Sequence, residues 1–250
     1  MTKELILKDL ITLSHDLGDE AREYVIIGEG NTSARISGET FWIKASGRNL
    51  KSIEAEGFVE VRVSDIIALL EGAGSDDDVT RVLSAARVDQ TVAVRPSVET
   101  FLHAVLYHLT DANFVGHTHA IAVNAILCSE HARDITLHLM PDEIVVCGVN
   151  SIFIPYLDPG LQLAHEVFAQ VREFVERYGQ APRVIYLQNH GLIALGQSPR
   201  QVENIMAMAV KHARVLAATY ALGGPHALQE SDIARIHTRP DEEVRRKQFK

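Results

Sequence analysis

The sequence contains few cysteines, no excess of positive charge and no long apolar run. Among its 250 residues only Cys128 and Cys147 occur, far apart and in no C-x-x-C pattern, so neither a disulfide framework nor a thiolate zinc site is predicted. A reducing, cytoplasmic environment fits this cysteine usage best. Asp and Glu outnumber Lys and Arg by 33 to 24, and the net charge of -9 offers no basic surface to a nucleic acid.

Membrane and nucleotide-binding signatures are missing as well. No stretch reaches 18 apolar residues, and charged side chains interrupt the leucines of residues 1–17, so neither a signal peptide nor a membrane span is predicted. The phosphate-loop pattern G-x-x-x-x-G-K-[ST] is absent, and the dinucleotide pattern G-x-G-x-x-G fails at Ser33. A chain that is 46% hydrophobic and 23% charged is typical of one globular domain.

The apolar spacing predicts alternating helices and strands along the chain. An amphipathic helix is expected over residues 3–17, and Ser64-Asp65 is expected to cap a short helix that precedes a surface loop over 71–78. Further helices are predicted over 97–109, 121–127, 160–178 and 198–222, and strands over 34–43 with a turn at 37–38, and over 58–62, 113–115, 143–147, 151–155, 183–187 and 192–195. Residues 226–250 are expected to form a charged tail with one short helix.

Two histidines stand one residue apart at a predicted strand-to-helix junction. In an extended segment His117 and His119 point to the same face, where two imidazoles can share a divalent ion such as zinc. The alternative is a pair of ordinary, partly buried histidines. A metal site requires a third ligand from elsewhere in the chain.

His190 and Glu99 are the candidates for the remaining ligands. His190 lies in an Asn-His-Gly break between two apolar strands, where it is either a third metal ligand or a hydrogen-bonded residue of a bulge. Glu99 follows Ser97, a predicted helix cap, so its carboxylate either stabilises the helix dipole or reaches the metal or a substrate. His103 and His108 are interpreted as core or helix-surface residues.

Two polar glycine-containing turns are candidates for anion binding. Gly30 and Gly47 would let the backbone approach an anion, and nearby Asn31, Ser33, Lys44 and Ser46 carry hydrogen-bond donors. Short Gly/Asn/Ser turns are also common for conformational reasons alone, and the residues by themselves favour that simpler interpretation.

Taken together, five motifs resemble those of the class II aldolase/adducin family. They are G-N-T-S at 30–33, A-S-G at 45–47, P-S-V-E at 96–99, H-T-H at 117–119 and N-H-G at 189–191, and the resemblance covers most of residues 5–222. It implies one α/β domain, a three-layer α/β/α fold around a largely antiparallel sheet, and a cyclic homotetramer with active sites between subunits.

The resemblance also implies roles for individual residues. His117, His119 and His190 fall on the metal-binding histidines, Glu99 falls on the catalytic acid, and Gly30, Asn31, Ser46, Gly47 and Ser97 fall on loops that hold a substrate phosphate. The implied cofactor is Zn²⁺, with Mn²⁺, Co²⁺ and Fe²⁺ as alternatives. In the implied mechanism the metal stabilises an enediolate and Glu99 moves the protons.

Two departures from the family pattern concern the substrate and the proton donor. Val98 stands where phosphate-binding aldolases commonly carry a second serine, for which Lys44 is a possible replacement. The family's catalytic tyrosines have no clear counterpart, and His138 is the candidate substitute. The resulting hypothesis is a zinc-dependent aldolase that cleaves a small ketose or ketose 1-phosphate, with a 4-epimerase, a dehydratase or a non-catalytic oligomerisation module as alternatives.

Overall fold

A mixed sheet forms the centre of the protein in the computed structural model, which describes residues 1–72, 76–91 and 94–248. Its described strands are β1 (Asn31–Arg35), β2 (Thr40–Lys44), β3 (Phe58–Arg62), β4 (Phe114–Thr118), β5 (Ile152–Ile154), β6 (Val184–Leu187) and β7 (Gly191–Gly196). They lie in the order β3-β2-β1-β4-β7-β6-β5. Every neighbouring pair is antiparallel except β5 and β6, which are parallel.

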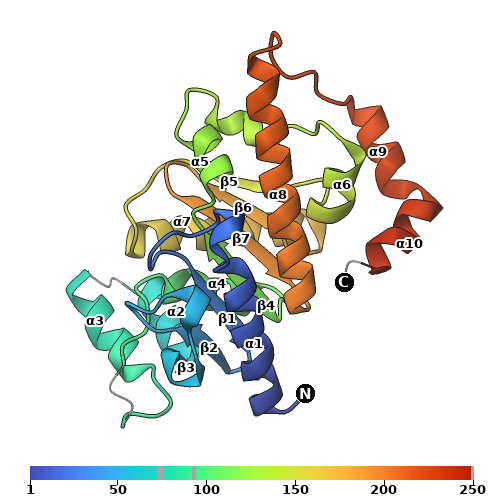
Figure 1. Ribbon diagram of the computed structural model, residues 1–250. Coiled ribbons are helices and arrows are strands. Elements are labelled where there is room, and N and C mark those ends of the chain that lie inside the picture. Colours follow the sequence, from blue (N-terminus) through green and yellow to red (C-terminus); the bar gives the residue numbers. More distant parts are fainter. Residues whose placement is uncertain (73–75, 92–93, 249–250) are drawn as a thin grey trace.

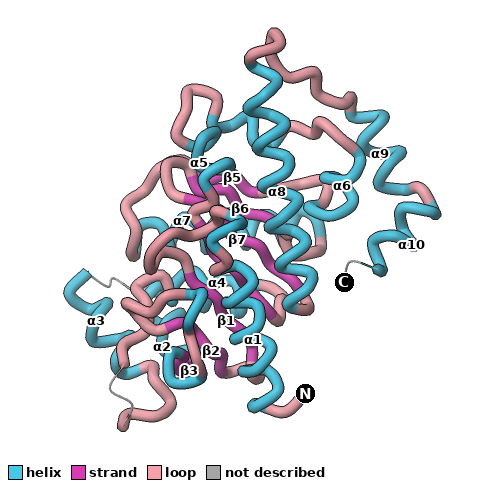
Figure 2. Tube along the Cα trace, in the orientation of Figure 1, coloured by secondary structure: helices cyan, strands magenta, loops and turns pink. Residues whose placement is uncertain are grey.

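Helices cover both faces of this sheet (Figure 1). The helices α1 (Lys3–Leu17), α5 (Ile121–Leu127) and α8 (Pro199–Tyr220) share one apolar core with the sheet, and α2 (Val63–Glu71), α3 (Asp76–Ala85), α4 (Thr100–Leu109) and α7 (Leu161–Tyr178) share the other. Figure 2 shows the strands as a continuous band between the two helical layers. The predicted three-layer α/β/α fold with a largely antiparallel sheet is therefore confirmed.

Strand β6 shows how the sequence produces two cores. Successive side chains of a strand point to opposite faces of the sheet. Val184 and Tyr186 accordingly lie in the core beneath α8, and Ile185 and Leu187 lie in the core against α7. A strand that is buried on both faces is a continuous apolar run in the sequence, so residues 183–187 were predictable as a strand. The apolar run does not indicate which strands pair with it.

Several local predictions were wrong. Residues 143–147, predicted as a strand, belong to helix α6 (Pro141–Cys147), which begins with Pro141 at a position where proline favours a helix. The helix α2 begins at Val63 directly after β3 and has no side-chain cap, so Ser64 does not cap it. The predicted loop over 71–78 overlaps the start of α3, although 73–75 lie outside the described residues.

The C-terminal segment contains more helix than expected. Two helices, α9 (Glu230–Thr238) and α10 (Pro240–Gln248), follow α8 where one short helix and a tail were predicted. Ile236 of α9 packs on Ile144 and Val145 of α6 in a small separate cluster. Across residues 1–72, 76–91 and 94–248, no helix has both the length and the hydrophobicity that crossing a membrane requires.

Candidate metal centre

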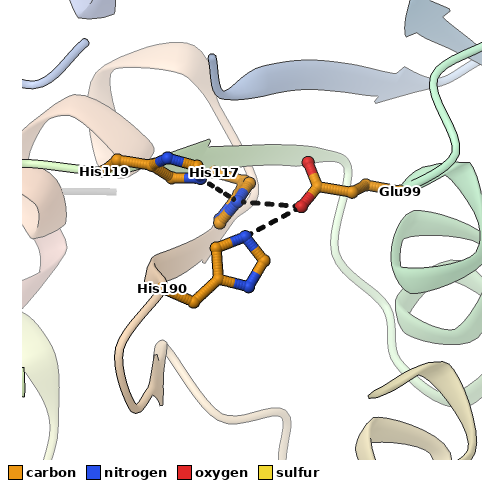
Figure 3. A group of neighbouring side chains, drawn as sticks. All are labelled: Glu99, His117, His119 and His190. Carbon is orange, nitrogen blue, oxygen red and sulfur yellow. Dashed lines mark hydrogen bonds and ion pairs between the residues drawn. The ribbon is translucent and has the colours of Figure 1, made fainter. Parts of the chain in front are cut away.

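Three histidines and one glutamate converge between the central strands and α4 (Figure 3). His117 lies on β4 and His119 directly follows it, His190 lies in the turn between β6 and β7, and Glu99 precedes α4. One potential ligand atom from each side chain lies within 4.8 Å of those from the other three. Residues up to 91 positions apart in the sequence therefore form one cluster.

The spacing of these atoms fits the coordination shell of a small divalent ion. Glu99 Oε1 lies 3.0 Å from His190 Nε2 and 3.4 Å from His117 Nε2, and His117 Nε2 lies 3.0 Å from His119 Nε2. A tetrahedral zinc site with metal–nitrogen bonds of about 2.0–2.1 Å has ligand atoms about 3.3 Å apart. Three imidazole nitrogens and a carboxylate oxygen are also a donor set that suits zinc.

Hydrogen bonds from outside the cluster hold the ring of His117 and the backbone of His190. The Nδ1–H of His117 donates to the carbonyl of Leu192 at 3.0 Å, which leaves the lone pair of Nε2 directed into the cluster. The side-chain amide of Asn124, on α5, donates to the carbonyl of His190 at 3.0 Å. The orientation of the His117 ring is thus fixed from outside the cluster, whereas Asn124 holds only the backbone of His190, whose buried Nδ1 has no hydrogen-bond partner among the described residues.

The Asn-His-Gly motif is a tight turn, not a bulge. Leu187 of β6 pairs directly with Gly191 of β7, and the three residues between them reverse the chain. Asn189 has φ 54°, in the left-handed region that asparagine tolerates better than most residues. This turn places His190 beside the end of β4, because β4 pairs with β7.

Close backbone contacts require glycine at two positions next to the histidines. A Cβ atom at Gly191 would lie 2.3 Å from the carbonyl oxygen of Thr118 and 2.9 Å from Cδ2 of His119. At Gly30, which has φ 72°, a Cβ atom would lie 2.7 Å from the carbonyl oxygen of His117. The glycines of the G-N-T-S and N-H-G motifs therefore permit the strands to approach and the histidines to meet.

The electrostatics of the cluster favour a cation. Burial acts to raise the pKa of Glu99, but the charges and hydrogen bonds of His117 and His190 lower it well below its ordinary value. Burial acts to lower the pKa of His117, and Glu99 outweighs this effect so that the pKa is raised overall. Burial and the neighbouring histidines lower the pKa of His119 to about 3. An ionised carboxylate and a neutral imidazole are therefore both available as ligands.

Glu99 is placed slightly differently from the prediction. Helix α4 begins at Thr100, so Glu99 is its N-cap residue and not part of the first turn. The hydroxyl of Ser97 accepts the backbone N–H of Glu99 at 3.3 Å, and the Glu99 side chain makes no capping hydrogen bond. The carboxylate is directed at the histidines (Figure 3), which favours the metal or substrate role over a purely dipolar one.

The predicted anion-binding turn at Gly47 lies next to residues 95–97, and Lys44 links it to Gly28, before the turn at Gly30. Ser46 N–H donates to the carbonyl of Arg95 at 2.8 Å, and Ser97 N–H donates to the carbonyl of Lys44 at 3.4 Å. Gly47 has φ 74°. The Lys44 side chain is buried and its Nζ donates to the carbonyl of Gly28 at 3.0 Å. Burial lowers the pKa of Lys44 although Glu99 and Glu29 act to raise it.

Asn31 and His138 have surroundings that the sequence did not indicate. The side chain of Asn31 is buried and contacts Glu99 and His103, so it acts on the carboxylate rather than on an open loop. His138 Nδ1 lies 2.7 Å from a carboxylate oxygen of Glu143, and its Nε2 donates to the carbonyl of Val149 at 2.8 Å. Both nitrogens of His138 are therefore engaged within the fold.

Sequence reasoning missed the link between Glu99 and His103. His103 was interpreted as a core or surface residue, and it is indeed fully buried, but it contacts Asn31, which contacts Glu99. The spacing of Glu99 and His103 could have indicated this link, because residues four apart at the start of a helix lie on the same face. Asn31 reaches both from β1, which pairs with β4 beside His117.

Comparison with known proteins identifies the family. A sequence profile of the class II aldolase and adducin N-terminal domain matches residues 8–217. The chain belongs to the class II aldolase and adducin family. The methylthioribulose-1-phosphate dehydratase of Klebsiella pneumoniae (strain ATCC 700721 / MGH 78578) is 30% identical over 214 residues, which cover 80% of this chain and 90% of that protein. The uncharacterized oxidoreductase YuxG of Bacillus subtilis (strain 168) is 27% identical over 201 residues, but the match spans only 27% of its length.

Solved structures of the family share this fold. The N-terminal class II aldolase domain of a conserved protein from Thermoplasma acidophilum superposes with a TM-score of 0.67 at 25% identity and covers 84% of this chain and 93% of its own. An L-fuculose 1-phosphate aldolase superposes with a TM-score of 0.68 at 18% identity, covering 94% and 96%. The resemblance drawn from five short motifs is therefore confirmed.

Proposed function

We propose that this protein is a zinc-dependent lyase that cleaves a small ketose or ketose 1-phosphate in a reversible aldol reaction. The observation that carries the proposal is the Glu99 carboxylate, held ionised among three imidazoles whose spacing fits one divalent ion. An ion bound there supplies Lewis-acid stabilisation of the negative charge that develops on the substrate oxygens. Membership of a family that includes aldolases and dehydratases supports the assignment to the lyases.

Glu99 is the group that moves the proton in this proposal. Its Oε1 faces the histidines while its other oxygen is bound by Asn31, so one oxygen remains available to a substrate. The Glu99 side chain is 16% exposed and that of His117 is fully buried, so a substrate approaches from the side of Glu99. In the condensation direction Glu99 Oε1 takes the proton from the carbon next to the ketone carbonyl, and in the cleavage direction it returns that proton.

The two turns near Glu99 are the proposed phosphate site. Backbone at Gly30 and Gly47 and the hydroxyls of Ser46 and Ser97 provide neutral donors, and Lys44 provides a buried positive charge. The exposed Val98 replaces a hydroxyl donor there, so a phosphate would depend more strongly on Lys44.

A dehydratase is the second candidate, because the relative from Klebsiella pneumoniae carries that activity in its name. Both reactions include a proton transfer to or from the carbon next to a ketone, so Glu99 and the proposed metal site serve either one. The distinction is whether a carbon–carbon bond breaks or water is lost.

Incubation of the zinc-loaded protein with L-fuculose 1-phosphate and, separately, with methylthioribulose 1-phosphate tests the proposal. Release of dihydroxyacetone phosphate from the first supports the aldolase, and a diketone product from the second supports the dehydratase. The variant Glu99→Gln, which keeps the shape of the side chain but cannot act as a base, is the matched control. Turnover by Glu99→Gln equal to that of the unchanged protein would refute the role of Glu99.

The proposed setting is a cytoplasmic homotetramer of one-domain subunits with its active sites between neighbours. The family resemblance supports the tetramer, and the acidic composition with only two free cysteines supports the reducing compartment. Light scattering during size-exclusion chromatography would measure the mass, for which a tetramer predicts four times 27.6 kDa.

A further inference from the structure

A chain of hydrogen bonds runs from the buried interior of α4 to the Glu99 carboxylate. The hydroxyl of Tyr107 lies 2.7 Å from Oγ of Ser33, and that oxygen lies 2.6 Å from Nδ1 of His103. Nε2 of His103 contacts Oδ1 of Asn31, and Nδ2 of Asn31 donates to Oε2 of Glu99 at 2.5 Å. The four residues that lead to Glu99 are each at most 3% exposed, so no water competes for these bonds.

The carboxylate at one end fixes the direction of every bond in the chain. An ionised carboxylate only accepts hydrogen bonds, so Asn31 must present its amide nitrogen to Glu99 and its carbonyl oxygen to His103. His103 must then carry its proton on Nε2. Burial lowers the pKa of His103 to about 3, so the ring is neutral and Nδ1 accepts from Ser33. Ser33 in turn accepts from Tyr107, whose raised pKa keeps the phenol protonated.

The amide of Asn31 has an alternative orientation that this chain prevents. If it rotated by half a turn, its oxygen would face Oε2 of Glu99 and its nitrogen would face the Nε2–H of His103. Two acceptors would then face each other on the Glu99 side, and two donors would face each other on the His103 side. This orientation is unfavourable because the site is buried and no water can satisfy the unpaired groups. His103 and Glu99 together therefore select one orientation.

We infer that His103 is a positioning residue for Glu99, acting through Asn31. Its Nε2–H fixes the Asn31 amide so that the amide nitrogen binds Oε2 of Glu99, and Oε1 is left to the histidine cluster and the substrate. This inference rests on the proposed function in treating Glu99 Oε1 as the working oxygen and, for the first readout below, in placing zinc at the histidine cluster; the second readout needs no metal. The contacts that carry it do not include His117, His119 or His190.

Two substitutions separate the two nitrogens of His103. Glutamine places an amide nitrogen near the position of Nε2, so His103→Gln retains a donor for Asn31. Asparagine is shorter and reaches only the position of Nδ1, so His103→Asn retains the contact with Ser33 and loses the donor. Each variant removes the imidazole and leaves a neutral amide, and each is therefore the control for the other.

The first readout is zinc affinity, measured by competition with a chromophoric chelator and needing no substrate. We expect His103→Gln to bind zinc within about threefold of the unchanged protein, and His103→Asn to bind it roughly tenfold or more weakly, as is typical when a group behind a ligand is removed. Equal affinity in the two variants would overturn the inference and leave His103 as a core residue.

The second readout is the proton position in metal-free protein labelled with ¹⁵N-histidine. Nitrogen chemical shifts distinguish the two neutral tautomers, and we expect His103 to carry its proton on Nε2 over the pH range 5 to 9. Ser33→Ala, a small change that preserves the imidazole, should leave this tautomer in place because Asn31 and Glu99 still require it. A proton found on Nδ1 would overturn the inference even if the histidine variants fail to fold. Because neither readout uses turnover, failure of the lyase assay would not be confused with failure here.

Discussion

Metal removal should lower the thermal stability of this protein by a measurable amount. A ligand that binds only the folded state, present at 1,000 times its Kd, stabilises that state by about 4.1 kcal/mol. For a chain of 250 residues, each kcal/mol shifts Tm by roughly 2–4 °C. Stripping zinc with a chelator should therefore lower Tm by about 8–16 °C, and returning zinc should restore it.

The difference in Tm between zinc-loaded and metal-free protein should become smaller as the pH falls. In the metal-free protein the raised pKa of His117 contributes stability below the unfolded pKa, and this is lost as pH rises through the folded pKa. The lowered pKa of Glu99 contributes stability above its unfolded pKa, lost as pH falls through the folded pKa. Zinc needs the neutral imidazole and competes with the proton on His117, so the gap in Tm between loaded and stripped protein should narrow from pH 8 to pH 5.

Differential scanning fluorimetry at both pH values, with zinc, manganese, cobalt and iron in turn, measures these effects. The double variant His119→Ala, His190→Ala removes two of the expected ligands and should show no shift with any metal. An equal shift in the double variant would place the metal elsewhere, and the absence of a shift with all four metals would refute the metal centre.

Three further substitutions, one of them with a control substitution, test particular contacts. Gly191→Ala places a Cβ atom 2.3 Å from Thr118 O and should weaken zinc binding roughly tenfold, whereas Gly38→Ala, whose Cβ meets no atom within 4 Å, should leave the titrated affinity unchanged. His138→Ala leaves the buried Glu143 without its partner and should lower the free energy of unfolding, measured with denaturant, by about 3 kcal/mol. Turnover should not fall. Loss of turnover at unchanged stability would support a catalytic role for His138. Lys44→Met should raise KM for a phosphorylated ketose on the order of tenfold and change KM for an unphosphorylated one little, and equal effects on both would argue against the phosphate site.

The layers of the fold follow from local patterns, whereas short elements depend on their neighbours. Residues 3–17 and 199–220 have long apolar periods and strong start or stop signals, and both were predicted as helices nearly to the residue. Residues 143–147 are a short apolar run that periodicity cannot assign. Ile144 and Val145 are buried against Ile236 of α9, which follows Val145 by 91 residues, so no local pattern predicts this contact.

The histidine cluster is a consequence of strand order, which no local pattern contains. The order β1-β4-β7 brings together strands that are far apart in sequence, and it pairs His117 with Asn31 on one side and with Ile193 on the other. With that register, His190, directly before β7, necessarily lies near His119, directly after β4. The three histidines could be predicted from their resemblance to the family motifs, because those motifs mark residues that the strand pairing brings together. They did not nominate His103, because it reaches Glu99 only through Asn31, across a register that must be known before the contact can be seen.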